Sequence, residues 1–353
     1  MRRYPAKCLV TKLVYTKRNK PNRGRIRELD ALRGFAVGAV LLFHYTIILP
    51  RYYPGSAPAP FLFPYGYYGV SLFFMISGYV ILMTLERCHR GADFVVSRFS
   101  RLFPVFWASV LVTYSVGSMA PLHGQEYSLP QLLVNLTMLQ SYLKVNSIDG
   151  VYWSLAYELG FYFAMYCLYK LRQLENIEQI CIIWLVGALL FNFFPEYLPH
   201  PLHYLLVIND YGHLFAAGIV FYRVSQTGYI GLRVPILLSA VFVQYLQEGI
   251  LGGVVIASFI TIFALIVAGR LSILDNKFLV YLGTISYSLY LVHQLVGFRI
   301  IRFLQESGTP GPASLLVAAL MTIALASLLT FGIERPAMAL LRHKYKVFVL
   351  ARQ

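Results

Sequence analysis

Two polar side chains that are costly to bury occur in one apolar stretch, RELDALRGFAVGAVLLFHY, at residues 27–45: Arg33 near its start and His44 deep in its second half. With about 100° and 1.5 Å per residue, a helix places them within about 20° of one face and about 16 Å apart. Alternatively, Arg33 is only an interfacial anchor, and His44 only forms a hydrogen bond between helices. Their shared face favours a deep cavity, because such groups inside a membrane need a partner or water.

Arg98 and Arg101, in SRFSRLFP, lie just before another apolar stretch. Three residues apart on a helix, they present two guanidinium groups to one point, which suits a diphosphate. The alternative is that they only anchor the helix at the cytoplasmic side. Because the predicted orientation places them on the same side as Arg33, a phosphate-bearing cytosolic ligand is favoured.

Glu158, in VYWSLAYELGFYF, is the one carboxylate embedded in its apolar stretch. A helix entering from outside near Val151 places it about 10 Å below the outer surface, close to the depth of His44. Asp30 would lie about 21 Å from His44 along a continuous helix, and its position is typical of an N-cap. We therefore predict that Glu158 orients His44 or handles a proton beside it. A break in the first helix would restore Asp30 to that role.

Other polar residues of the apolar stretches are candidates for substrate binding. Ser286, Tyr290 and His293 follow i, i+4, i+7 spacing on one helix face, where hydrogen bonding within the core is the alternative. Trp153 is either an interfacial anchor or a platform that stacks on a sugar. Ser77 lies in a stretch whose small residues are typical of close helix packing. No cluster with metal-ligand spacing occurs in the sequence, so no metal is expected.

The composition predicts a membrane protein. The chain has 353 residues, of which 58% are hydrophobic and 13% charged, against roughly 45–50% and about 25% in soluble domains. The net charge is +15, but the basic residues lie between apolar runs, so nucleic-acid binding is not expected. Residues 1–26 are rich in Lys and Arg without the apolar core of a signal peptide, which predicts a cytoplasmic tail.

The apolar stretches predict an all-α, polytopic membrane protein with about ten transmembrane helices. The pair on either side of Gly249 could instead be one re-entrant unit. Lys and Arg gather on alternate loops, so the positive-inside rule places both termini in the cytoplasm. We expect one transmembrane domain at 27–336, a basic cytoplasmic tail at 337–353, and outer loops at 50–64 and 120–151. The stretches lie at about 31–50, 66–86, 102–120, 152–171, 179–195, 205–222, 234–248, 250–269, 279–298 and 312–333.

Six motifs in order resemble the membrane-bound acyltransferase 3 family, the O-acyltransferases of bacterial polysaccharides and related glycans. The resemblance covers roughly residues 27–336. The motifs are RELDALRG with Arg33, ten residues and His44; GVSLFFMISGYVI; Arg98-Phe99-Ser100-Arg101 before Leu102 and Pro104; WSLAYE ending at Glu158; SYSLYLVH ending at His293; and IERP at 333–336.

The resemblance implies ten transmembrane helices in the bacterial cytoplasmic (inner) membrane. It implies acyl-coenzyme A as co-substrate, without a permanently bound cofactor, and a glycan or other hydroxyl-bearing acceptor outside the cytoplasm. It also implies that Arg33 and His44 are essential and that Arg98 and Arg101 contribute to the donor site. The sequence leaves the acyl group, the acceptor and the oligomeric state open.

If the three arginines hold the phosphates, the pantetheine arm is long enough to climb the 16 Å or so to His44. His44 is then the predicted general base for the acceptor hydroxyl, with a covalent acyl-histidine as the variant. Two rival classes are a transporter or flippase for a lipid-linked saccharide and a non-catalytic scaffold for polysaccharide assembly.

Overall fold

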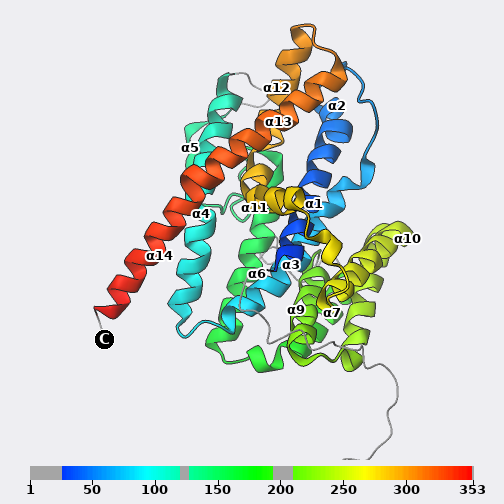
Figure 1. Cartoon of the computed structure of the whole chain (residues 1–353), viewed down its shortest axis with the longest axis vertical. Coiled ribbons are helices and arrows are strands. Elements are labelled where there is room, and N and C mark those ends of the chain that lie inside the picture. The colour runs from blue at the N-terminus through cyan, green and yellow to red at the C-terminus, as the bar shows by residue number, and fades with distance from the viewer. Residues whose placement is uncertain (1–25, 120–126, 194–209, 352–353) are drawn as a thin grey trace, which may run out of the picture.

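The chain folds into a bundle of helices (Figure 1). The computed structural model describes residues 26–119, 127–193 and 210–351, and every regular element in these ranges is a helix. The all-α prediction is therefore confirmed for the described residues. The α-helices are α1 Arg27–Phe43, α2 Leu49–Tyr52, α3 Tyr68–Leu85, α4 Gly91–Met119, α5 Leu129–Leu136, α6 Trp153–Lys170, α7 Ile177–Phe193, α9 Gly212–Thr227, α10 Val234–Val267, α11 Lys277–Val292, α12 Leu295–Glu306, α13 Gly311–Leu329 and α14 Arg335–Leu350.

Five helical segments of the described chain are long and apolar enough to cross a membrane. A sixth is formed by α11 and α12 if this pair, bent by 75° at a short break, counts as one span. The protein is thus a multi-pass membrane protein, whereas ten spans and two cytoplasmic termini stay predictions. Parts of the stretches predicted at 179–195 and 205–222 lie outside the described residues. The five segments are Arg27–Tyr52, Pro64–Leu85, Gly91–Met119, Val234–Val267 and Gly311–Leu350.

The element α10 is a helical hairpin. Gly249 has φ 73° and ψ −165°, a backbone conformation that glycine adopts far more readily than other residues. A Cβ added at Gly253 would lie 3.8 Å from the carbonyl oxygen of Val241. In a straight helix these two positions would be about 18 Å apart, so the chain reverses its direction between them. The two arms correspond to the predicted stretches on either side of Gly249.

The helix that carries Arg33 and His44, α1, packs backbone to backbone against α11. A Cβ added at Gly34 would lie 2.0 Å from the carbonyl oxygen of Leu279, and one at Gly283 would lie 1.8 Å from that of Asp30. Only glycine permits such an approach. The two helices that carry the candidate histidines are therefore held at a fixed distance.

Glycines also join α3 to its neighbours, as the sequence predicted for Gly69 and Gly78. A Cβ at Gly69 would lie 2.5 Å from the carbonyl oxygen of Ala36 in α1. A Cβ at Gly78 would lie 2.1 Å from the carbonyl oxygen of Phe215 in α9. The helix α3 is thus fixed between α1 and α9, with Ser77 beside one of these contacts.

Both central helices are irregular at the level of the histidines. After Phe43, α1 continues as a π-helical turn, His44–Ile48, before α2. The helix α11 ends at Val292, and α12 starts at Leu295 in a direction 75° away. Local π-helical turns are frequent at functional sites. Together the two breaks present His44 and His293 to one another.

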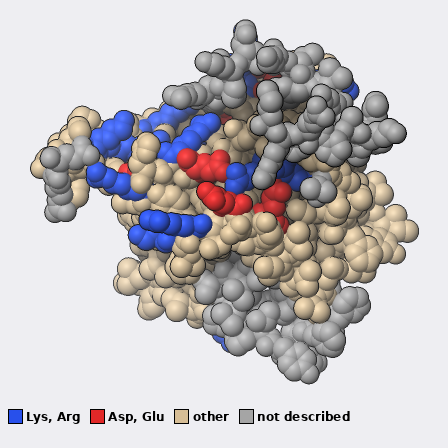
Figure 2. All heavy atoms as spheres, turned by 90° about the horizontal axis from the view of Figure 1, so that it is seen from below, with Lys and Arg blue, Asp and Glu red and all other residues tan. Residues whose placement is uncertain are grey.

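The end of the bundle where α1 and α4 begin, called the arginine end below, is rich in charge. Lys and Arg side chains cluster on the face seen from below, with Asp and Glu among them (Figure 2). The helix α14 packs on the first turns of α4: Arg342 Nε donates to Ser100 Oγ at 3.3 Å, and the Tyr345 hydroxyl donates to Asp93 at 2.7 Å. The residues expected as a C-terminal tail are thus helical up to Leu350.

Candidate active site

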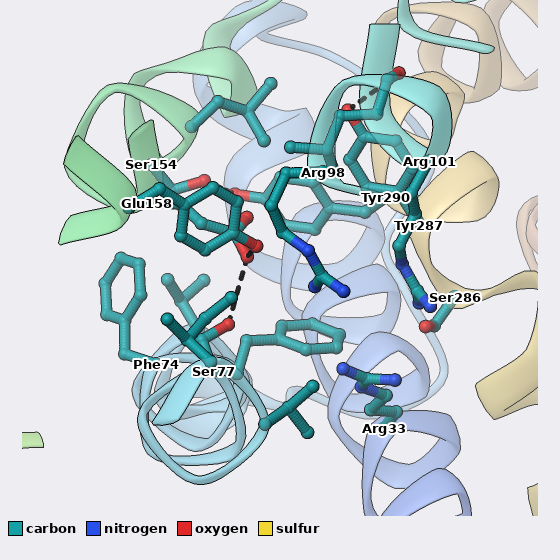
Figure 3. A pocket seen from close by; sticks show the side chains of 17 residues that line it. Arg33, Phe74, Ser77, Arg98, Arg101, Ser154, Glu158, Ser286, Tyr287 and Tyr290 are labelled. Carbon is teal, nitrogen blue, oxygen red and sulfur yellow. Dashed lines mark hydrogen bonds between the residues drawn. The ribbon is translucent and has the colours of Figure 1, made fainter. Parts of the chain in front are cut away.

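A cavity of about 70 Å³ lies between α1, α3, α4, α6 and α11. Arg33, Arg98 and Arg101 point their guanidinium groups toward a common space, and Glu158 and Ser77 lie together on another wall (Figure 3). Residues from five separate helices therefore line one space, as the spacing arguments predicted for the arginines.

The arginine cluster, Arg33, Arg98 and Arg101, makes few direct ion pairs, although Glu158 lines the same cavity. The one carboxylate within 4.0 Å of these guanidinium groups in the described part of the chain is Asp30, whose Oδ1 lies 3.8 Å from Arg33 Nη1. Arg98 donates to Ser97 Oγ at 3.3 Å, and its buried Nε has no hydrogen-bond partner. Because buried cations without partners are costly, the cluster is suited to an anion.

Asp30 lies inside the first turn of α1, whose N-cap is Ile26. The predicted N-cap position is therefore wrong, because the helix starts four residues earlier than expected. The carboxylate of Asp30 points to the arginine cluster rather than to His44, which lies about 21 Å further along α1.

A second hollow, of about 590 Å³, adjoins the cavity at the arginine end. Arg33, Val80 and Arg101 line both spaces. Arg87 and Glu334 line only the second one. The two spaces thus lie on either side of the arginine cluster.

Glu158 is bound by two hydroxyl groups. Its Oε1 accepts hydrogen bonds from Ser77 Oγ at 3.0 Å and from the Tyr162 hydroxyl. Neither bond involves His44, so the predicted pairing of Glu158 with His44 is not formed. Similar depth in the membrane does not bring two groups together when their helices face different neighbours. Glu158 instead shares the cavity wall with the arginine cluster.

The partner of His44 is His293. Nε2 of His293 lies 3.2 Å from Nδ1 of His44, and the two rings meet edge to face with their centroids 4.8 Å apart. Nδ1 of His44 also lies 2.8 Å from the carbonyl oxygen of Val40. His293 is fully buried, whereas His44 is partly exposed.

The hydrogen bonds assign the protons of this pair. Nδ1 of His293 faces two carbonyl oxygens, of Tyr290 at 2.8 Å and of Leu289 at 3.2 Å, so it carries the proton. Nε2 of His293 is then an acceptor for Nδ1–H of His44, which also donates to Val40. His44 Nε2 is left with its lone pair, which is the form that a general base needs.

Tyr290 separates the cavity from the histidine pair. It lines the cavity, and its ring centroid lies 5.7 Å from that of His293. Its hydroxyl bonds to Ser154 Oγ at 2.7 Å and donates to the carbonyl oxygen of Val151 at 3.0 Å. The cavity that contains the arginine cluster therefore extends as far as Tyr290, and His44 is not among the residues that line it.

Trp153 lies outside the cavity lining. Its ring packs against Tyr157 and Tyr211, at centroid distances of 5.8 and 5.6 Å. His213 bonds to Gln244 at 2.8 Å in the core. Among the described residues, no three potential metal-ligating side chains come together.

Asp149 is a buried carboxylate that our sequence reasoning missed. It lies in the loop before α6 and accepts backbone hydrogen bonds from Leu295, at 3.0 Å, and Val151, at 3.2 Å. Its position in a predicted outer loop, 120–151, hid it, because a carboxylate in such a loop is expected to be exposed to solvent. The sole available signal was an acidic residue followed by glycine, which is typical of turns.

We expect the stability of the protein to depend on pH through Asp149. Burial raises the pKa of its carboxyl to about 7, against the opposing effect of the Leu295 and Val151 N–H donors. A carboxyl with a raised pKa stabilises the fold below its unfolded pKa of about 4, and this contribution is lost as the pH rises through 7. Between these values the melting temperature of the wild type should fall relative to that of Asp149→Asn. Parallel melting profiles of the two proteins would contradict this assignment.

Comparison with known proteins identifies related sequences. The sequence model of a family described as "Acyltransferase domain" matches residues 26–331. A protein of Acidianus two-tailed virus named "Putative acetyltransferase ORF330" is 25% identical over 301 residues, which cover 81% of this chain and 86% of the viral protein. No solved structure gives a significant match. The family match spans α1 to α13 and so includes the arginine cluster and both histidines.

Proposed function

Since the chain belongs to this acyltransferase family, we propose that it transfers an acyl group, acetyl or similar, from cytosolic acyl-coenzyme A to a hydroxyl of a glycan or glycoconjugate. The acceptor lies on the far side of the cytoplasmic membrane in this proposal. The arginine end faces the cytosol, in keeping with the positive-inside rule. His44 is the proposed general base.

The observation that carries the proposal is the arginine cluster at the junction of the two hollows. Three guanidinium groups with one nearby carboxylate suit the phosphates of coenzyme A. The thiol arm would extend along the cavity, past Glu158 and Ser77, toward Tyr290. The length of α1 between Arg33 and His44, about 16 Å, is comparable with that of the arm.

The histidine pair supplies a base for the chemical step, which in this proposal takes place once the thioester has passed Tyr290. In the proposed reaction, Nε2 of His44 takes the proton of the acceptor hydroxyl while the oxygen attacks the thioester carbonyl carbon. The tetrahedral intermediate then collapses, the carbon–sulfur bond breaks, and the proton passes from His44 to the departing thiolate. His293 holds Nδ1–H of His44 throughout, so the base keeps the required tautomer.

The test is the release of free coenzyme A. Purified protein in lipid vesicles would receive acetyl-coenzyme A and the surface glycan fraction of cells from which the gene has been deleted. Thiol release and a mass increase of the glycan by one acetyl group are expected. A transporter or flippase would release no thiol, so glycan-dependent release separates the two classes.

We expect Arg101→Ala to weaken acetyl-coenzyme A binding with a smaller effect on kcat. One charge-assisted contact contributes about 1.5–3 kcal/mol, which corresponds to a roughly ten- to hundredfold rise in Kd. Isothermal titration of the detergent-solubilised protein measures this constant. The matched control is Arg90→Ala, which removes an exposed arginine that immediately precedes the same helix and lines neither hollow. Equal Kd values for the two variants would exclude the cluster as the phosphate site.

A further inference from the structure

The break between α11 and α12 exposes backbone groups that need hydrogen-bond partners. A helix end leaves its last carbonyl oxygens and the N–H groups of the next helix without intrahelical partners. Buried groups of this kind must be satisfied by side chains. His293 lies in this break, one residue after the end of α11. The groups that bond to the backbone of the break therefore also fix the position of the His293 ring, which contacts His44.

Three side chains from other elements satisfy these groups. The Tyr45 hydroxyl donates to the carbonyl oxygen of His293 at 3.1 Å. The Tyr152 hydroxyl donates to the carbonyl oxygen of Leu291 at 3.2 Å. Asp149 Oδ2 accepts the N–H of Leu295 at 3.0 Å. Two of the three side chains thus come from the short segment that precedes α6.

Asp149 joins two chain segments through its two oxygens. While Oδ2 binds Leu295, Oδ1 accepts the N–H of Val151 at 3.2 Å. The carboxylate is 0% exposed. Next to it, a Cβ added at Gly150 would lie 3.0 Å from Nε2 of Gln294, so the segment lies directly against the break. A carboxylate can accept both N–H groups at once, whereas a neutral amide offers one oxygen.

We propose that Asp149 is a positioning residue for the histidine pair. Its carboxylate fixes the N–H of Leu295, two residues after His293, and so keeps Nε2 of His293 within reach of Nδ1 of His44. That contact, at 3.2 Å, is near the long end of the hydrogen-bond range. A small shift of the break would therefore remove one of the two acceptors that hold Nδ1–H of His44. The catalytic consequence rests on the proposed role of His44, whereas the structural one does not.

The first arm of the test measures the break itself. Hydrogen–deuterium exchange of peptides covering residues 293–298 would be compared in the full-length wild type, Asp149→Ala and Asp149→Asn. Both variants should exchange faster than the wild type in these residues, since each loses at least one of the two bonds. Unchanged exchange in folded Asp149→Asn would overturn the proposal. This arm requires no substrate, so it stands even if the proposed activity fails.

The second arm measures catalysis against a matched control. Asn135 is equally buried, and its Oδ1 accepts the N–H of Ile148 at 3.0 Å, one residue before Asp149. Asn135→Ala loosens the same loop without touching the break. We expect Asp149→Asn to lower kcat roughly tenfold to a hundredfold, as small misplacements at reacting groups do, with the KM for acetyl-coenzyme A unchanged. Asn135→Ala should keep most of its kcat.

The two arms separate the possible failures. If exchange rises but kcat of Asp149→Asn matches that of Asn135→Ala, the carboxylate only stabilises the loop and the positioning role is wrong. If the wild type itself releases no coenzyme A, the proposed function fails, and the exchange arm alone decides whether Asp149 holds the break.

Discussion

Alanine at position 44 is expected to abolish acyl transfer while leaving donor binding intact. General base catalysis contributes about a hundred- to ten-thousandfold to the rate, so kcat of His44→Ala should fall by that factor. The Kd for acetyl-coenzyme A should stay unchanged, because the arginine cluster lies about 16 Å away along α1. Coenzyme A release and isothermal titration on the same preparation measure the two quantities.

A buried histidine outside the site gives the control for this experiment. His213 on α9 bonds to Gln244 at 2.8 Å and has no contact with the cavity lining. His213→Ala creates a similar loss of a core imidazole, so any general effect on folding should appear there as well. Full transfer activity in His44→Ala would end the proposed mechanism, and an equal loss in both variants would assign the effect to stability.

The kcat of His293→Phe should lie between that of His44→Ala and that of His213→Ala. The phenyl ring can fill much of the space but cannot accept the hydrogen bond from Nδ1 of His44. The other bond of that nitrogen, to the carbonyl oxygen of Val40 at 2.8 Å, remains. The His44 tautomer with its proton on Nδ1 therefore loses only one of two stabilising acceptors. A smaller drop in kcat than for His44→Ala is expected.

Local spacing was sufficient to predict the parts of the site that lie on one helix. Arg98 and Arg101 share α4 and both line the cavity, in the direction that helical geometry indicated. Arg33 on α1 lines the same cavity, whereas His44, in the π-helical turn after α1, does not. The small residues Gly69 and Gly78 likewise marked close helix packing before the partner helices were known. These inferences needed no knowledge of how the helices are arranged.

Contacts between distant segments could not be predicted from spacing. His44 and His293 are separated by 249 positions, and sequence reasoning assigned His44 to Glu158 on depth alone. Depth fixes one coordinate of a residue, whereas rotation of each helix about its axis decides which neighbour it meets. The π-helical turn at His44 and the break after His293 alter this rotation locally. Asp149 was missed for the same reason, since the break leaves the backbone N–H of Leu295 free to bond to its carboxylate.

Alanine at Gly34 or Gly283 is expected to separate the two helices that carry the histidines. The added Cβ would meet backbone carbonyl oxygens, at 2.0 Å from Leu279 and 1.8 Å from Asp30. Backbone atoms cannot rotate away as side chains can, so the helices must move apart. Overpacking of this kind costs about 1–3 kcal/mol or more, which exceeds the gain of up to about 1 kcal/mol in helix propensity. A lower melting temperature and a lower kcat should therefore appear together.

Gly38, one helical turn beyond Gly34 on α1, supplies the matched control. A Cβ added there would meet nothing within 4 Å, so Gly38→Ala should be neutral or stabilising by up to about 1 kcal/mol. The same substitution on the same helix is thus expected to change stability with opposite sign at the two positions. Because α1 and α11 approach through Gly34 and Gly283, only those variants should lengthen the contact between His44 and His293. If Gly34→Ala melts at or above the wild-type temperature and keeps full activity, α1 and α11 do not pack as closely as described, and the histidine pair loses its structural basis.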